Sequence, residues 1–313
     1  MMTTAEPAPP PTILEPPFAT VLAQWEREAD HGTLDLGRYR SAYYAWGQGP
    51  ALVFVHGLGD GPRSFVPTLF HLRRHFRCVA YQGPTGVGDG ARLRGYRHAD
   101  LVADLVAVLD QLGVPAATVI GHSFGSTVAV RALHDYPDRL PRGVLIAGFA
   151  HRPLRLVRWW MAQVARWLTG SRRLADMRRR EEMMRRVHFA PFERLEPDLW
   201  RFFLETTGPS PLKALAHWAL TMHGNDLTAL LPAVRQPVLV IGGDADPLVP
   251  FAYQERLFHG LPNAALFQVT GSGHLPTLTH PRTTADALKR FLGAPTCQME
   301  CLTTGGCAAA SPP

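Results

Sequence analysis

The chain has 313 residues, of which 46% are hydrophobic and 19% are charged, with a formal net charge of +6. This length suits one large α/β domain with an insertion, or two ordinary domains, and the composition is typical of a globular protein with a substantial core. The low charged fraction excludes a coiled coil or a largely disordered chain. No uninterrupted apolar run reaches the roughly 18 to 20 residues needed to span a bilayer.

The two ends of the chain differ in composition from its middle. The start, MMTTAEPAPPPTILEPP, is rich in proline and has neither the basic start nor the apolar stretch of a secretory signal. We therefore expect an unstructured segment, assigned to residues 1–20, and a cytoplasmic protein. Residues 295–313 contain three cysteines, at 297, 301 and 307, whose spacing matches no zinc pattern. We expect an unstructured tail with free thiols.

Strand-like and helix-like segments alternate along most of the chain. The expected strands are 40–46, 51–55, 76–81, 117–120, 143–147, 237–243 and 265–269, and the expected helices are 65–75, 98–112, one from Ser123 to about Tyr136, and 286–292. This alternation predicts an α/β fold with a mostly parallel central sheet and helices on both faces. Residues 151–225 interrupt it with a helical block, which predicts an inserted cap on a core formed by residues 21–150 and 226–294.

The cap carries most of the positive charge. Residues 151–186 contain eleven arginines, opposed by only Asp176, Glu181 and Glu182, and several tryptophans and leucines lie among them. Three roles are open for this block: a solvated helix face, a site for anionic substrates or lipid headgroups, or a nucleic-acid surface. No nucleic-acid-binding motif accompanies it, so we expect no nucleic-acid partner.

A serine lies between two glycines immediately after an apolar strand. Gly121-His122-Ser123-Phe124-Gly125 follows the strand at 117–120 and precedes an amphipathic run. In a nucleophile elbow the glycines leave room for a sharp strand-to-helix turn, and the serine hydroxyl is presented near a helix N-terminus that favours developing negative charge. This context predicts that Ser123 is a nucleophile.

A serine hydroxyl attacks poorly unless a base takes its proton. His274, in the glycine-rich loop after the last strand, is the expected base; His56 and His280 lack that context. The carboxylate that orients the base is expected at Asp246, in the loop after the strand at 237–243, with Asp244 as its competitor. Loops at the carboxyl ends of parallel strands converge on one edge of a sheet, and the chain order Ser, Asp, His fits a catalytic triad.

An oxyanion needs two backbone donors. We expect one to be the N–H of Phe124, which follows the nucleophile, and the other to be the N–H of Leu58 in the loop HGLGDG. Gly57 and Gly59 allow this loop to approach closely, and His56 is expected either to hold the loop by hydrogen bonds or simply to pack against it.

The chain resembles the α/β-hydrolase superfamily. The motifs that carry the resemblance are LVFVHGLGDG, VIGHSFGS, GGDADPLVP and GSGHLPTLTHP, and it covers about residues 42–292, with the cap least alike. The resemblance implies a Ser123–His274–Asp246 triad, an oxyanion hole at Leu58 and Phe124, no metal and no organic cofactor. Two departures are the loop YQGPTGVGDGARL, which differs from the usual pattern after the strand at 76–81, and Thr279, where relatives often have an acidic residue.

We therefore expect a serine hydrolase that cleaves a small-molecule carboxylic ester or thioester through an acyl-enzyme. The apolar residues of the cap should make the acyl pocket apolar. An acyltransferase or a carbon–carbon bond hydrolase would use the same triad, and a non-catalytic binding protein is the alternative from another class. A further variant is a lipase-like protein whose basic cap makes weak contact with an anionic membrane.

Overall fold

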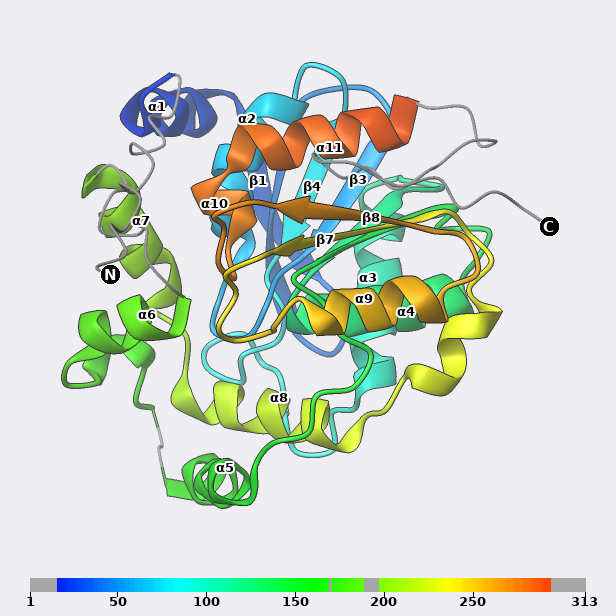
Figure 1. Ribbon diagram of the computed structural model, residues 1–313. Helices are drawn as coiled ribbons and strands as arrows, with labels where there is room; N and C mark the ends of the chain where they lie inside the picture. The colour runs from blue at the N-terminus through cyan, green and yellow to red at the C-terminus, as the bar shows by residue number, and fades with distance from the viewer. Residues whose placement is uncertain (1–15, 169–170, 189–196, 294–313) are drawn as a thin grey trace, which may run out of the picture.

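The computed structural model describes residues 16–168, 171–188 and 197–293, and a single eight-stranded sheet lies at its centre (Figure 1). The strands are β1 (Asp30–Asp35), β2 (Arg40–Trp46), β3 (Ala51–Val55), β4 (Arg77–Tyr81), β5 (Thr118–His122), β6 (Arg142–Ile146), β7 (Val238–Gly243) and β8 (Ala264–Val269). Their order in the sheet is β1-β2-β4-β3-β5-β6-β7-β8. Strand β2 is antiparallel to both of its neighbours, and the remaining pairs are parallel. The expected α/β fold with a mostly parallel sheet is confirmed.

The central strands are apolar on both faces because helices cover both faces. In β3, Val53 and Val55 belong to one hydrophobic core, whereas Leu52 and Phe54 belong to the other. Side chains alternate across a strand, so one short run of consecutive apolar residues supplies both cores. This explains why the run ALVFV does not show the polar alternation of a half-exposed strand.

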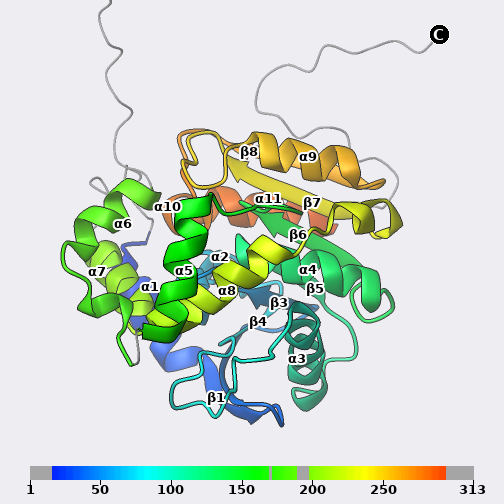
Figure 2. The ribbon, with the colours of Figure 1, turned by 90° about the horizontal axis from the view of Figure 1, so that it is seen from below.

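The helices form a layer on each side of the sheet. Helices α1 (Phe18–Glu28), α2 (Val66–Leu72) and α11 (Pro281–Gly293) contribute to one core, and α3 (His98–Gln111), α4 (Phe124–Asp135) and α9 (Ala252–Gly260) contribute to the other. Figures 1 and 2 show the two layers on opposite sides of the sheet. The described helices between β6 and β7 are α5 (Leu156–Leu168), α6 (Arg180–His188), α7 (Pro197–Thr207) and α8 (Leu212–Gly224). They lie along the edge where the parallel strands end.

Some elements were not expected from the sequence. Strand β1, DHGTLD, lacks an apolar alternation because most of its residues are exposed, and it is held by backbone pairing with β2. Helix α9 buries only Gln254 and Leu257, which is too small an apolar face to be recognised in the sequence. The short helix α10 (Pro276–Thr279) follows the His274 loop. The expected helix at 65–75 is a 3₁₀ turn, Pro62–Phe65, followed by α2.

The boundary of the N-terminal segment needs correction. Helix α1 begins at Phe18, so residues 18–20 are helical rather than part of an unstructured segment. The physical reason is long-range packing: Phe18 is fully buried, and its ring centroid lies 4.9 Å from that of Phe202 in α7. The prediction for residues 295–313, with its three cysteines, lies outside the described residues. Cys78 is a buried thiol.

None of the helices in the described ranges combines the length and the apolar character that crossing a bilayer requires.

We expect Phe54→Ala to lower the free energy of unfolding by about 3–5 kcal/mol, because it removes a fully buried ring and leaves a cavity. The ring centroid of Phe54 lies 5.1 Å from that of Phe65, so an aromatic contact is lost as well. Urea unfolding followed by circular dichroism measures the change. Tyr136→Ala, on the surface, is the control and should change stability by less than about 0.5 kcal/mol. Equal losses in the two variants would contradict the prediction.

Candidate active site

The turn between β5 and α4 places Ser123 in a strained conformation. Its φ is 52° and its ψ is −117°, outside the regions that non-glycine residues normally occupy. The N–H of Ser123 donates to the carbonyl of Ile146 at 2.9 Å, and its carbonyl accepts from the hydroxyl of Ser126 at 2.6 Å. Hydrogen bonds on both sides of the residue hold this conformation, which is the geometry of a nucleophile elbow.

The two glycines of the motif are required by close packing. A Cβ at Gly125 would collide with the backbone of Val55 at the end of β3, and one at Gly121 would collide with the backbone of Gly125 and Ser126. Helix α4 therefore begins in direct contact with the sheet. Any larger side chain at either position would push the helix away and relax the turn at Ser123.

Three predicted residues from three loops meet at this turn. The Nε2 of His274 lies 2.9 Å from the Oγ of Ser123, and its Nδ1 lies 2.7 Å from the Oδ2 of Asp246. Asp246 and His274 are 6% and 4% exposed. Because the carboxylate is an acceptor, Nδ1 carries the proton in this arrangement and Nε2 is able to accept the serine proton.

Asp244, the alternative carboxylate, lies elsewhere. It is exposed, and its Oδ1 accepts from the N–H of Gly271 at 2.8 Å. Burial alone would raise the pKa of Asp246. The hydrogen bond with His274 and the hydrogen bonds from the N–H groups of Val249 and Leu248 outweigh this effect, so the pKa of Asp246 is lowered below its ordinary value. Asp246 is therefore held as a carboxylate beside the imidazole.

The loop after β3 lies beside Ser123. A Cβ at Gly57 would lie 3.2 Å from the Cβ of Ser123, so this backbone passes close to the nucleophile. Gly59 has a φ of 74°, a left-handed conformation that favours glycine. Leu58 lines the cavity that contains Ser123, and Phe124 is the first residue of α4, where backbone N–H groups have no partner within the helix.

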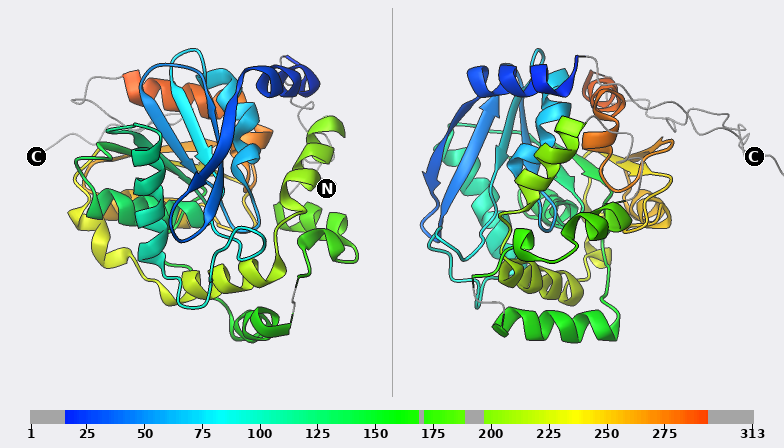
Figure 3. Two further views of the ribbon diagram at one scale, coloured as in Figure 1. Left: turned by 180° about the vertical axis from the view of Figure 1, so that it is seen from behind. Right: turned by 90° about the vertical axis from the view of Figure 1, so that its left-hand side faces the viewer.

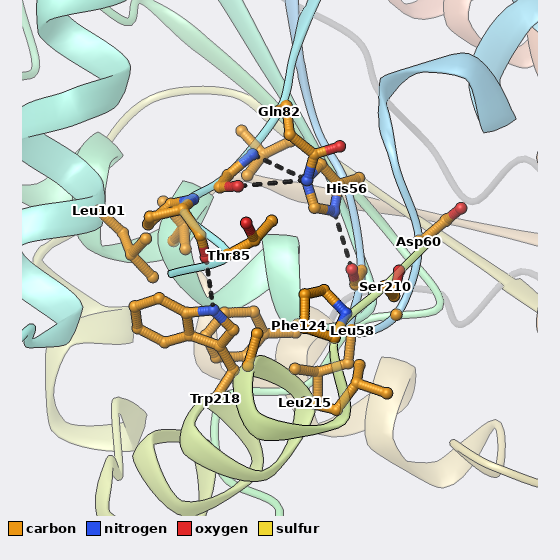
Figure 4. A pocket seen from close by; sticks show the side chains of 18 of the residues that line it. His56, Leu58, Asp60, Gln82, Thr85, Leu101, Phe124, Ser210, Leu215 and Trp218 are labelled. Atoms are coloured by element: carbon orange, nitrogen blue, oxygen red, sulfur yellow. Dashed lines mark hydrogen bonds between the residues drawn. The ribbon is translucent and has the colours of Figure 1, made fainter. Parts of the chain in front are cut away.

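His56 contacts two loops. Its Nδ1 lies 2.9 Å from the carbonyl oxygen of Gly57, and its Nε2 accepts from the N–H of Gly83 at 2.9 Å (Figure 4). The Nε2 of Gln82 lies 3.3 Å away from the same ring nitrogen. The contact with Gly57 lies within the loop that contains Leu58, and the contacts with Gly83 and Gln82 join that loop to the one after β4. Gln82 and Gly83 were not singled out in the sequence.

A second buried carboxylate, that of Asp60, lies near His122. Asp60 is 8% exposed, and its Oδ2 lies 3.7 Å from the Nδ1 of His122. The Nε2 of His122 lies 2.9 Å from the carbonyl oxygen of His274. Burial raises the pKa of Asp60 to about 6, although the N–H of Gly61 and the hydroxyl of Ser64 partly offset this effect. Asp60 was not singled out in the sequence, and its place in the glycine-rich loop HGLGDG was the one feature that could have pointed to it.

The cavity at Ser123 lies between the core and the cap. It measures about 200 Å³, and residues of the cap give it an apolar wall: Leu174, Met184, Phe203, Leu215 and Met222. The tryptophans of α5 are not among the lining residues, and Trp160 and Trp167 are exposed. The cap also contributes two polar residues to the lining, Arg152 and Thr207. The guanidinium of Arg152 donates to the carbonyl of Leu248 at 2.6 Å.

A smaller cavity adjoins this one. It measures about 60 Å³ and shares Leu58, Asp60 and Leu215 with the larger cavity. Figure 4 shows His56 and Gln82 on one side of it and Trp218 on the other. The indole N–H of Trp218 donates to the carbonyl of Pro84 at 3.0 Å, and the ring of Trp218 forms part of the cavity wall.

Within the described residues, no group of three or more His, Cys, Asp or Glu side chains has the arrangement of a metal site.

The site has a strained serine at a strand–helix turn, and a histidine and a buried carboxylate lie in line with it at one edge of a mostly parallel sheet. This arrangement is typical of α/β hydrolases. The chain belongs to the Alpha/beta hydrolase family, whose model matches residues 52–287. It is 27% identical over 270 residues to a 2-(acetamidomethylene)succinate hydrolase of Mesorhizobium japonicum, covering 83% of this chain and 94% of the relative. It is 29% identical over 251 residues to a poly(3-hydroxyalkanoate) depolymerase of Ectopseudomonas oleovorans, covering 78% and 84%.

The fold is also that of a solved structure. An enol-lactonase from Burkholderia xenovorans LB400 superimposes with a TM-score of 0.75 at 20% identity, covering 84% of this chain and 100% of that one. The family and the relatives support an enzyme of the hydrolase type.

Asp60 should make stability depend on pH. Its pKa is about 6 in the folded protein and 3.8 ordinarily, so the folded state holds the proton more tightly. The contribution of Asp60 to the free energy of unfolding is therefore highest below pH 3.8 and falls as the pH rises to about 6, by about 3 kcal/mol in total. Asp60→Asn has no carboxyl group to titrate, so it does not lose this stability. In urea unfolding, its free energy of unfolding should rise relative to that of the wild type by about 3 kcal/mol between pH 4 and pH 7. Asp138→Asn, on the surface, is the control; if the Asp60→Asn and wild-type profiles run parallel, the assignment is wrong.

Proposed function

We propose that this protein is a serine hydrolase that cleaves a carboxylic ester or thioester through an acyl-enzyme, with Ser123, His274 and Asp246 as its triad. The observation that carries this proposal is the continuous line of contacts from Asp246 through His274 to Ser123, at 2.7 and 2.9 Å. The 2.9 Å contact is within the range in which a base accepts a proton from a nucleophile, and the 2.7 Å contact is short enough for the carboxylate to orient that base.

The proposed reaction begins when the Oγ of Ser123 attacks the acyl carbonyl while the Nε2 of His274 takes its proton. The N–H groups of Leu58 and Phe124 stabilise the oxyanion of the tetrahedral intermediate. When the carbon–oxygen or carbon–sulfur bond breaks, His274 returns the proton to the leaving group and an acyl-Ser123 ester remains. Water, deprotonated by His274, then attacks this ester and releases the acid. Asp246 fixes the imidazole tautomer and stabilises its positive form.

The shape of the site favours small acyl groups. The cavity at Ser123, at about 200 Å³, is smaller than the roughly 300–1,000 Å³ of ordinary ligand sites. Apolar side chains from the cap line it, so the acyl chain is the part of the substrate that suits it. The small adjoining cavity beside Leu58 and Phe124 is positioned to receive a short substituent on the other side of the carbonyl.

Hydrolysis of p-nitrophenyl esters from acetate to palmitate tests the proposal. We expect kcat/KM to be higher for short chains than for palmitate, and we expect Ser123→Ala to abolish turnover on every ester because no nucleophile remains. Residual hydrolysis equal to that of the wild type in Ser123→Ala, or no activity on any ester, would refute an esterase that uses this serine. Activity that appears only with an added acyl acceptor would indicate an acyltransferase instead.

Asp246 and Asp244, which lie two residues apart in the loop after β7, allow a matched comparison. Asp246→Asn should lower kcat by roughly 10⁴, as in triads where the amide leaves the imidazole in the wrong tautomer. Asp244→Asn changes the same functional group two residues away and keeps an oxygen to accept from Gly271, so its kcat should stay within about twofold of the wild type. Both are measured on the best p-nitrophenyl ester. A larger loss in Asp244→Asn would reassign the carboxylate.

A further inference from the structure

Helix α5 is the outermost element of the cap. It packs against α8, and Figures 1 and 3 show it on the far side of α8 from the sheet. Of the eight large hydrophobic side chains that are exposed in the described residues, six lie on this helix: Leu156, Val157, Trp160, Met161, Val164 and Trp167. Single exposed apolar residues are common on protein surfaces, but a contiguous group of this size marks an interaction site.

The spacing of these six residues places them on one side of the helix. Their positions follow each other at intervals of one and three residues, which at 100° per residue places them on one continuous face. The opposite side holds the buried Ala162 and the half-buried Trp159, which face α8. Trp160 is 58% exposed and Trp167 is 66% exposed, so two large rings stand in solvent. The helix is thus amphipathic with its apolar side outward, the reverse of an ordinary surface helix.

A basic hollow adjoins this apolar face. It measures about 620 Å³, and its lining includes the cations of Arg92, Arg94, Arg166 and Lys213. Trp167 is shared between the hollow and the apolar face, and the guanidinium carbons of Arg94 and Arg166 lie 5.9 and 5.3 Å from its ring centroid. None of the described residues that line the hollow is acidic. Such a site attracts an anion such as a phosphate group.

The same sign of charge continues along the helix. Residues 156–168 contain two arginines and no acidic residue, and both Arg158 and the preceding Arg155 are exposed. A second copy of this chain would bring like charges together across a symmetric contact, which is unfavourable. A lipid surface with anionic headgroups satisfies both features, since it offers an apolar layer to the helix and phosphates to its cationic rim.

We propose that α5 lies in the interfacial layer of an anionic phospholipid membrane, with its six apolar side chains among the upper acyl chains. The hollow of Arg92, Arg94, Arg166 and Lys213 binds a lipid phosphate at the edge of the helix. Tryptophan is suited to this layer because its ring is apolar and its N–H is polar. This docking does not depend on the chemistry at Ser123.

Co-sedimentation of the full chain with vesicles tests the proposal. We expect binding to phosphatidylcholine vesicles that contain 30% phosphatidylglycerol, little binding to pure phosphatidylcholine, and a decrease at high salt because screening weakens attraction between exposed charges. Trp160→Ala/Trp167→Ala should weaken the partition coefficient about tenfold or more. Arg94→Glu/Lys213→Glu should remove the preference for phosphatidylglycerol.

Matched controls separate docking from loss of folding or of net charge. Tyr136→Ala removes an exposed aromatic residue elsewhere. Arg235→Glu/Arg282→Glu makes the same change in net charge at two exposed arginines that do not line the hollow. Both variants should bind vesicles like the wild type. Ser123→Ala should also bind normally, which keeps this test independent of catalysis. Circular dichroism checks that every variant is folded.

Four results would overturn the proposal. The first is no binding to anionic vesicles, and the second is binding that the tryptophan pair does not affect, which would indicate electrostatic attachment without insertion of α5. The third is binding that the two charge-reversal pairs weaken equally. The fourth is a concentration-dependent dimer in sedimentation equilibrium that the tryptophan pair dissociates.

Discussion

The close contact between the start of α4 and the end of β3 is the constraint on which the site depends. Gly125 has no room for a Cβ because the backbone of Val55 lies against it, so the chain must reverse sharply between β5 and α4. That reversal places Ser123 at a φ of 52° and directs its side chain away from both elements. The burial of two cores, one on each face of the sheet, holds this strained turn in place.

The parallel sheet then brings the other site residues to the same edge. His274 and Asp246 come from loops after β8 and β7, which pair with each other, and β7 follows β6 and β5 in the sheet. Ser123 and His274 thus come together although they are 151 residues apart in the sequence, whereas Asp246 and His274 are 28 residues apart. Asp60 and His122 lie next to this group: the Nε2 of His122 lies 2.9 Å from the carbonyl oxygen of His274, and the centroids of the two imidazole rings are 5.1 Å apart.

The cap divides its side chains between two surfaces. Leu174, Met184 and Phe203 turn inward and enclose the cavity at Ser123, whereas the apolar face of α5 turns outward. Helix α8 lies between them, and it carries both Leu215 in the active-site cavity and Lys213 in the basic hollow. A surface bound by α5 would therefore lie one helix away from the proposed catalytic site.

The sequence by itself determined the α/β fold and seven of the eight strands of the described sheet, and it singled out Ser123, His274 and Asp246 as the candidate residues, because buried strands and sharp glycine turns leave local signals in the order of residues. It did not reveal β1, α9 or the start of α1, whose stability comes from pairing or packing with distant segments such as Phe202. Only the tertiary structure decided which apolar residues of the cap face the cavity and which face solvent. An amphipathic pattern shows that a helix has an apolar side, but the neighbours packed against the helix determine where that side points.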